Sequence, residues 1–530
     1  MAATAPTGGY VPVMTSQPAS TPAHMPLDEF RRRGHAMVDA IADYWASLQS
    51  PGAPPVLCPL KPGGVLAALP QAAPEHPEPF DAVMADVHRL IVPGLTHWQH
   101  PSFFAYFPSN SSGPSVLGDL LSTGLGVQGM LWATSPACTE LETCVTEWMA
   151  RALGLPDGFL APRGDGAAGD AWSPRLQGGG VIQGTASEST LVALLAARSR
   201  LRRLDPRATP TVYCSSQAHS SVVKAAMIAG VADPDGTPRV RQIATRRDWT
   251  IDPDALRGRI RTDLAAGFRP AMVVATLGTT GVMAFDDLRA VGAAVDSAGS
   301  PHPVWIHADA AMGGAAFICP ELRAPLAGAE RLDSLCFNPH KWLLTSFDCG
   351  LFWTRDRASV IDALSVTPEY LRNAASNAGA VTDYRDWQVP LGRRFRSLKL
   401  WFVLRHYGLQ GLRAHIRAHL ASADWLETQV RADDRFELAA PRPACSPLLC
   451  LALKGDASTP QKAADLNDRA RSLMERVNAA GAAYFSHTTL PDLERPANPA
   501  RFVIRFAIGG TFTTRGHVER AWELLRTSPV

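Results

Sequence analysis

Short apolar runs alternate with helical segments between about residues 113 and 400, and this alternation constrains the fold most strongly. The runs GGVIQG, TPTVYCSS and PAMVVATLGTT each precede a stretch with helical spacing of apolar residues. Strands separated by helices of about 10–15 residues pair in parallel, because a parallel connection needs a crossover. We therefore predict an α/β domain with a mostly parallel sheet and helices on both faces.

The segments on either side of this domain predict further structural parts. Residues 26–112 combine helical spacing with a Pro-rich stretch and an aromatic loop, which indicates an N-terminal helical arm. Residues 401–530 contain long amphipathic helices and strand-like runs, which indicate a smaller α+β domain. We expect a disordered tail over 1–25 and a flexible insertion over 161–176.

The composition argues against several classes of function. The 51 basic and 49 acidic residues leave a formal net charge of +2, which does not favour nucleic acid or an anionic membrane as partner. The nine cysteines are scattered and lack a CxxC pair, which favours a reducing compartment and argues against structural zinc. No secretory signal or membrane-spanning run is evident. We therefore expect a cytoplasmic protein that acts on a small molecule.

Polar residues follow several of the predicted strands, at the edge where open α/β sheets bind ligands. Thr185 and Ser187 open a helix after GGVIQG, where backbone N–H groups could hold a phosphate, although simple capping of the helix is an alternative. His219 follows the next strand and is either structural or a ligand-binding residue. Asp309 is the last residue of VWIHAD, and His307 faces the same side of the strand. These two residues could bind a metal, but no third metal ligand is evident, so we expect no metal.

Lys341 completes this edge in the motif NPHKW, directly after an apolar run. A buried lysine is costly unless it is paired or neutral, so it is either a surface residue or a residue with a chemical role. A phosphate cradle, an imidazole, a carboxylate and a lysine are together what pyridoxal phosphate requires. The lysine forms a Schiff base with the aldehyde, and the carboxylate keeps the ring nitrogen protonated.

Long motifs in this chain resemble those of the group II pyridoxal-phosphate amino-acid decarboxylases. They include GGGVIQGTASESTLVALLAAR, QAHSS, ATLGTT, HADAA, NPHKW and DYRDWQVPLGRRFRSLKLWF. The likeness is greatest to the aromatic-L-amino-acid decarboxylase branch, with the tryptophan and tyrosine decarboxylases. It implies fold type I, a homodimer with its active site at the subunit interface, and decarboxylation of an aromatic L-amino acid to an arylalkylamine and carbon dioxide.

The resemblance also implies a role for each matching residue. Lys341 would be the Schiff-base lysine, Asp309 would pair with the ring nitrogen, and His219 would stack on the ring and orient the substrate carboxylate. The other cofactor contacts would come from Thr185, Ala186, Ser187, Thr280, Ala311, Asn338 and His340. The substrate pocket would be formed by Trp98, Tyr106, Phe107, Pro108, Ser109, Gln128, Met130 and Gly392, together with His219.

Residues 367–387 match the mobile loop that closes over the neighbouring subunit's active site in this family. Within it, Tyr370 would protonate the substrate carbon after carbon dioxide leaves. Related aldehyde synthases typically carry Phe at this place and divert the reaction to oxygen. Because only Tyr has a hydroxyl that can donate a proton, Tyr370 favours decarboxylation. An aromatic acetaldehyde synthase and a non-catalytic cofactor-binding protein are the alternatives.

Two pocket residues bear on the choice of substrate. Gly392 leaves room where some relatives carry Ser. We therefore expect substrates with indole or catechol rings to be favoured. Gln128 could donate to a ring hydroxyl or could face solvent. Tryptophan, 5-hydroxytryptophan, dihydroxyphenylalanine, tyrosine and phenylalanine all remain in the expected class.

Overall fold

A computed structural model describes residues 24–161, 178–366 and 381–529 of the chain. The chain divides into two compact units, which meet in sequence between Ala53 and Pro54. The first unit contains α1 (Leu27–Leu48), whose side chains Phe30, Met37 and Val38 are exposed. All other described elements belong to the second unit.

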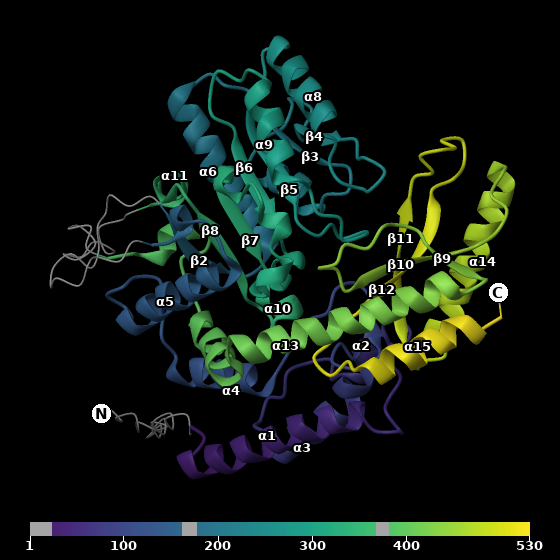
Figure 1. Cartoon of the computed structure of the whole chain (residues 1–530). Coiled ribbons are helices and arrows are strands. Elements are labelled where there is room, and N and C mark those ends of the chain that lie inside the picture. The colour runs from purple at the N-terminus through teal and green to yellow at the C-terminus, as the bar shows by residue number, and fades with distance from the viewer. Residues whose placement is uncertain (1–23, 162–177, 367–380, 530) are drawn as a thin grey trace, which may run out of the picture. The chain divides into compact units, whose positions relative to one another are not determined.

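A seven-stranded sheet forms the core of the second unit, with the strand order β2–β8–β7–β6–β5–β3–β4 (Figure 1). Strand β8 runs antiparallel to both of its neighbours, and the remaining pairs are parallel. The predicted mostly parallel sheet is therefore confirmed. The strands are β2 (Gly179–Gln183), β3 (Pro210–Ser215), β4 (Val240–Ile243), β5 (Arg269–Thr276), β6 (Trp305–Asp309), β7 (Ser334–Phe337) and β8 (Gly350–Thr354).

Helices cover both faces of this sheet, because successive side chains of a strand point to opposite faces. On β5, Val273 belongs to one core cluster, whereas Met272 and Val274 belong to another. The Val273 cluster includes side chains from α5 (Pro136–Leu153), α8 (Pro253–Ala265) and α9 (Leu288–Ser297). The other cluster includes side chains from α6 (Ala186–Leu204), α7 (Ser221–Ile228) and α11 (Arg357–Leu364).

A five-stranded sheet near the C-terminus has the order β1–β11–β12–β10–β9 and packs against three helices. Its first strand comes from the aromatic segment that we expected to be a loop, and this strand pairs in parallel with β11. The smaller α+β part is thus confirmed, with one strand contributed from far upstream. Its elements are β1 (Phe103–Phe104), β9 (Phe436–Leu438), β10 (Leu448–Leu453), β11 (Tyr484–Leu490), β12 (Arg501–Ala507), α13 (Arg396–Ala432), α14 (Pro460–Ala479) and α15 (Arg515–Thr527).

The predicted boundary at 400/401 lies inside α13, and the boundaries of the four predicted segments stay predictions. The remaining helices are α2 (Gly64–Ala68), α3 (Phe80–Asp86), α4 (Gly113–Leu125) and α10 (Pro339–Trp342). Short stretches of 3-10 or π-helix are η1 (Val87–Ile91), η2 (Val92–Gly94), η3 (Asp157–Phe159), η4 (Gly313–Ile318), η5 (Pro320–Leu322), η6 (Ala324–Leu326), η7 (Ala329–Arg331) and η9 (Tyr384–Trp387).

Several predictions fall outside the described residues. They are most of the 1–25 tail, the 161–176 insertion apart from its first residue, and Tyr370 with most of its loop. Within the three described ranges, no helix is both long and apolar enough to cross a membrane.

Candidate active site

Six strands of the large sheet run in one direction, and the predicted cofactor residues follow five of them at the same edge. Strands β2, β3, β5, β6 and β7 share one direction, so their carboxyl ends converge. Hydrogen bonds join the segments that follow. The Ala186 N–H donates to Asn338 Oδ1 at 2.9 Å, and the Asn338 N–H donates to the Ala311 carbonyl at 3.0 Å.

Lys341 lies on the short helix α10, between the buried side chains of His340 and Trp342. Its Nζ is 5.4 Å from the centre of the Phe107 ring. No residue of the described ranges forms a hydrogen bond or ion pair with this amine. Removal from water lowers the pKa of Lys341, although the charge of Asp309 opposes the shift. A lysine with a lowered pKa supplies the neutral amine that Schiff-base formation needs.

Asp309 and His219 lie close enough to Lys341 to influence one another's charge. Asp309 is 5% exposed and accepts the Ala311 N–H at 3.0 Å. The pKa of His219 is lowered by removal from water and by Lys341, and Asp309 acts in the opposite direction. His219 Nδ1 accepts the Ser221 N–H at 3.1 Å, so the neutral ring carries its proton on Nε2. A ligand that contacts Nε2 of His219 would therefore meet an N–H donor.

The N-terminus of α6 is arranged to receive an anion. Thr185 occupies the N-cap position, but its side chain makes no capping hydrogen bond, so the capping alternative has no support for this residue. Instead, the Asn338 carboxamide accepts the Ala186 N–H, and Ser187 is exposed in the first turn. Because the helix dipole favours negative charge here, the position suits a phosphate.

Thr280 and His340 are the remaining predicted cofactor residues. Thr280 is exposed after β5, whereas the adjacent Thr279 is buried and its hydroxyl oxygen accepts the Ala284 N–H at 3.0 Å. His340 Nδ1 accepts the Cys349 N–H at 3.0 Å, and burial lowers the pKa of His340 to about 4. His340 is thus a neutral, fixed support for α10.

Comparison with known proteins identifies the family. Residues 62–454 match the model described as the pyridoxal-dependent decarboxylase conserved domain. The chain belongs to the pyridoxal-dependent decarboxylase family. It is 43% identical to an aromatic-L-amino-acid decarboxylase of Rattus norvegicus, over 94% of this chain and 97% of that relative. It is 44% identical to a phenylacetaldehyde synthase of Arabidopsis thaliana, over 95% of this chain and 96% of that relative.

Solved structures show the same relationship. The structure of Oryza sativa TDC with PLP and tryptamine superposes with a TM-score of 0.85 and 40% identity, covering 95% of this chain and 98% of that one. The resemblance inferred from the motifs and the expected fold type I are therefore confirmed.

Pyridoxal phosphate is the cofactor of this decarboxylase, and the residues present fit it. Lys341 offers an unpaired amine within the described residues. Asp309 lies near it, and the α6 N-terminus faces Asn338. Gly350 keeps this cradle open, because a Cβ there would come within 3.0 Å of Asn338 Oδ1 and of the Thr185 backbone. When bound, the cofactor supplies a ring that takes up the electron pair released by the departing carboxylate.

Apart from His219, the predicted substrate residues fall into two groups. The first is the segment 98–109, where Trp98 stacks on Tyr106 with ring centres 5.8 Å apart and Phe107 approaches Lys341. Tyr106 has a left-handed backbone with φ 51° and is about half exposed. Such a conformation is uncommon for a bulky residue and is typical of functional sites. Pro108 is buried, and Ser109 accepts a hydrogen bond at its carbonyl from Gln99 Nε2 at 2.6 Å.

The second group consists of Gln128, Met130 and Gly392. Gln128 Oε1 accepts the Arg393 N–H at 3.2 Å and would lie 3.6 Å from a Cβ at Gly392. The Met130 carbonyl accepts the Arg385 N–H at 3.1 Å. Within the described ranges, no hydrogen bond or ion pair joins this group to Lys341, Asp309 or His219.

Arg505 is a site residue that the sequence reasoning missed. It lies on β12, is 3% exposed, and donates to the carbonyls of Gly281 at 3.1 Å and Tyr106 at 2.9 Å. Its guanidinium lies 5.0 Å from the Phe107 ring centre, and its charge contributes to the lowered pKa of Lys341. An arginine within the apolar run RFVIRFA was the available signal, because a buried charge in a strand requires a partner or a role.

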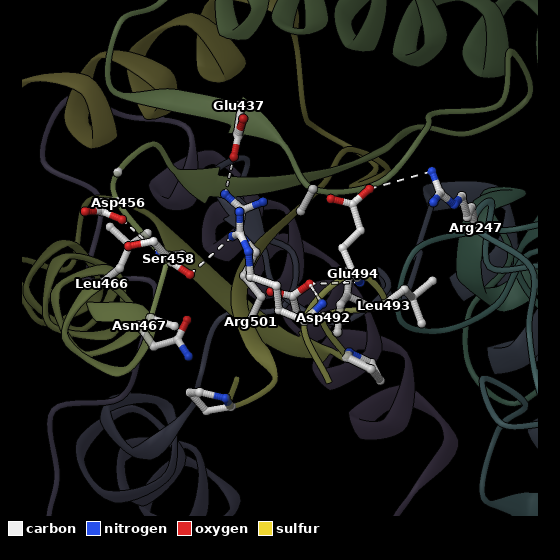
Figure 2. A pocket seen from close by; sticks show the side chains of 18 of the residues that line it. Arg247, Glu437, Asp456, Ser458, Leu466, Asn467, Asp492, Leu493, Glu494 and Arg501 are labelled. Carbon is white, nitrogen blue, oxygen red and sulfur yellow. Dashed lines mark hydrogen bonds and ion pairs between the residues drawn. The ribbon is translucent and has the colours of Figure 1, made fainter. Parts of the chain in front are cut away.

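A surface hollow of about 570 Å³ lies between α14 and the connection from β11 to β12, away from these residues. Figure 2 shows that its charged side chains face one another, with Arg501 paired to Glu437 and Arg247 to Glu494. None of the predicted site residues in the described ranges lines it. Because these charges already have partners, the hollow is not the candidate active site.

Proposed function

We propose that this enzyme decarboxylates an aromatic L-amino acid to the arylalkylamine and carbon dioxide. The observation that carries the proposal is a group of aromatic side chains in segment 98–107: Phe107 lies beside Lys341, and the adjacent Tyr106 stacks on Trp98. Flat aromatic side chains favour an aromatic substrate, because offset stacking adds to the burial of apolar area. The relatives named for aromatic amino acids support the same class.

Different residues of the chain would bind the substrate, hold the cofactor and transfer the proton. The Nε2–H of His219 would hold the substrate carboxylate, and Lys341 would release the cofactor to the incoming amine and later recover it. Asp309 would keep the cofactor's ring nitrogen protonated. Tyr370 would deliver the proton to the substrate carbon after carbon dioxide leaves.

A substrate panel tests this function. Tryptophan, 5-hydroxytryptophan, tyrosine, dihydroxyphenylalanine, phenylalanine, histidine and glutamate are each supplied, and amine, carbon dioxide and peroxide are all measured. We expect amine and carbon dioxide in equal amounts from at least one aromatic substrate. A preference for glutamate or histidine would exclude the aromatic assignment.

An aromatic acetaldehyde synthase is the second candidate, because a phenylacetaldehyde synthase is among the similar relatives. That reaction consumes oxygen and water and yields aldehyde, carbon dioxide, ammonia and hydrogen peroxide. Tyr370 favours the decarboxylase, since its hydroxyl can protonate the substrate carbon before oxygen reacts. We expect Tyr370→Phe to shift the product from amine toward aldehyde, and an unchanged product ratio would remove the proton-donor role.

We propose further that the enzyme is a homodimer with shared active sites. Helix α4 exposes Leu117, Leu120, Leu121 and Leu125, each about half accessible, and their spacing places them along one stripe. An exposed apolar stripe of this kind marks an interaction surface. Within this group, Gln128 and Met130 follow α4 closely in sequence. The group, which also contains Gly392, lacks a hydrogen bond to Lys341 within the described residues. We infer that it completes the pocket of the neighbouring subunit.

Mixed dimers test the shared site. In a mixture of Lys341→Ala and Tyr370→Phe chains, half of the dimers contain one chain of each kind. If each site combines the lysine of one subunit with the loop of the other, each mixed dimer has one complete site, so we expect about a quarter of the wild-type amine production. A mixture that forms no more amine than its separate components would contradict the shared site.

We propose a cytoplasmic location, for which the nine cysteines are the support. All nine lie in the described residues, no disulfide joins any two of them, and seven of them are buried. Free thiols persist in a reducing compartment. Cell fractionation checks the location, and recovery of the enzyme in an oxidising compartment would contradict it.

A further inference from the structure

A row of buried polar side chains leads through the sheet to Asp309. Trp305, His307 and Asp309 lie on β6, and Ser334 and Cys336 lie on β7. The two strands are parallel, with His307 opposite Ser334 and Asp309 opposite Cys336. The side chains therefore follow one another across the two strands in the order Trp305, Ser334, His307, Cys336, Asp309. We call the first four the Trp305–Cys336 relay.

Each step of the relay is within hydrogen-bonding reach. Trp305 Nε1 lies 2.8 Å from Ser334 Oγ, and Ser334 Oγ lies 2.8 Å from His307 Nδ1. His307 Nε2 lies 3.7 Å from Cys336 Sγ, which lies 4.0 Å from Asp309 Oδ1. The two steps at sulfur are longer and weaker, because a thiol is a weak donor and a weak acceptor. The four relay residues have no exposed surface, so water does not compete with these contacts.

The donor and acceptor capacities of these groups set the direction of the relay. The indole N–H of Trp305 can only donate, so Ser334 Oγ accepts it. The one hydroxyl hydrogen of Ser334 then has His307 Nδ1 as its acceptor among the described residues. This leaves the imidazole proton on Nε2, which faces Cys336. The tautomer thus follows from the network of partners.

The protonation states support this direction. Burial lowers the pKa of His307 to about 4, so the imidazole is neutral and carries a single proton. Burial raises the pKa of the Cys336 thiol well above its ordinary value, so the S–H hydrogen is retained and faces Asp309. Aligned in this way, every donor in the relay is oriented toward the carboxylate, and each bond polarises the next.

We propose that the Trp305–Cys336 relay stabilises the ionised carboxylate of Asp309 and that Cys336 is a positioning residue for cofactor binding. The inference rests on the proposed pairing of Asp309 with the cofactor's ring nitrogen, which only an ionised carboxylate keeps protonated. A carboxylate buried at a strand end needs such donors, and among the described residues the Ala311 N–H also donates to Asp309. Among the described residues, His219 and Lys341 are further titratable groups that interact electrostatically with Asp309.

Three variants of the full-length enzyme test the relay. Cys336→Ala removes the thiol, Cys336→Ser keeps an O–H donor, and Cys214→Ala is the matched control, because Cys214 is a buried cysteine on β3 of the same sheet that lies outside the relay. The measurements are the dissociation constant of pyridoxal phosphate from the apoenzyme and the pH dependence of the bound cofactor's visible absorption. Catalytic activity is not needed for either measurement.

We expect Cys336→Ala to weaken cofactor binding by about five- to tenfold, the loss of one weak hydrogen bond to a charged group, and to shift the pH dependence of the absorption. Cys336→Ser and Cys214→Ala should bind like the wild type. Equal behaviour of Cys336→Ala and Cys214→Ala would overturn the proposal. A loss in Cys336→Ser as large as in Cys336→Ala would also overturn it, because it would indicate packing alone.

Two more variants allow the relay to be tested if Cys336→Ala fails to fold, and separate the relay from the proposed function. If Cys336→Ala does not fold, Ser334→Ala interrupts the relay between Trp305 and His307 and carries the same expectation. Asp309→Asn separates this inference from the proposed function. Unchanged cofactor binding and absorption in Asp309→Asn would refute the pairing with the ring nitrogen. A change in Asp309→Asn with none in Cys336→Ala or Ser334→Ala would reject the relay alone.

Discussion

Glu142 and Arg393 form a buried ion pair. Removal of the Glu142 carboxylate tests how much this pair stabilises the fold. Both side chains are at most 1% exposed. The carboxylate of Glu142, on α5, contacts the Arg393 guanidinium and accepts the Ile182 N–H at 2.8 Å. Arg393 also donates to Gln388 Oε1 at 2.6 Å. The pair therefore joins α5, β2 and the segment next to Gly392.

The expected cost of Glu142→Ala follows from these contacts. The variant leaves a guanidinium in the core without its counter-charge, which costs about 3–5 kcal/mol of unfolding free energy. The Ile182 N–H also loses its acceptor, which alone costs about 1–3 kcal/mol. Arg393 keeps Gln388 and the Ile182 carbonyl, so we expect a total of about 4 kcal/mol. A double variant, Glu142→Leu with Arg393→Met, should cost less than Glu142→Ala, because no charge remains buried.

Urea denaturation followed by tryptophan fluorescence measures this effect, at one cofactor concentration for all variants because binding itself stabilises the fold. The matched control is Glu321→Ala, which breaks the ion pair with Arg417, where both side chains are about half exposed. We expect no resolvable change there. A Glu142→Ala variant as stable as this control would refute the reasoning, and so would a double variant less stable than Glu142→Ala.

Three further predictions concern the site and its pH dependence. Lys341→Ala should abolish the visible absorption of the lysine-bound cofactor, and retention of that band would refute the assigned lysine. Gly392→Ser places a side chain 3.6 Å from Gln128 Oε1, so we expect the KM for indole substrates to rise more than the KM for tyrosine; equal changes would contradict a role in selectivity. Burial lowers the pKa of His307 and His340 to about 4, below the ordinary 6.5, so the unfolded chain binds protons that the folded chain does not. Stability should therefore fall as the pH drops from 6.5 toward 4, by up to about 1.4 kcal/mol per pH unit for each histidine. Thermal denaturation across this range checks it, and a constant Tm between pH 6.5 and 5 would contradict it.

The cofactor group could be predicted from sequence because each member directly follows a strand. Parallel strands place their carboxyl ends at one edge, so Asp309 and Lys341 were expected to converge without knowledge of any distance. The same logic predicted the helix N-terminus after GGVIQG. It did not show that Asn338 holds Ala186 in place of a capping Thr185, because that contact joins residues 152 positions apart in the chain.

The sequence alone determined the class of fold, the family and the cofactor, because strand–helix alternation and long local motifs carry that information within short stretches of chain. Only the tertiary structure decided which polar residues meet. Arg505 reaches Phe107 from a strand of the other sheet, and Cys336 reaches Asp309 through the register of two neighbouring strands. The physical reason is that hydrogen bonds and charge interactions act over a few ångströms, and the packing of the chain determines which distant residues come that close.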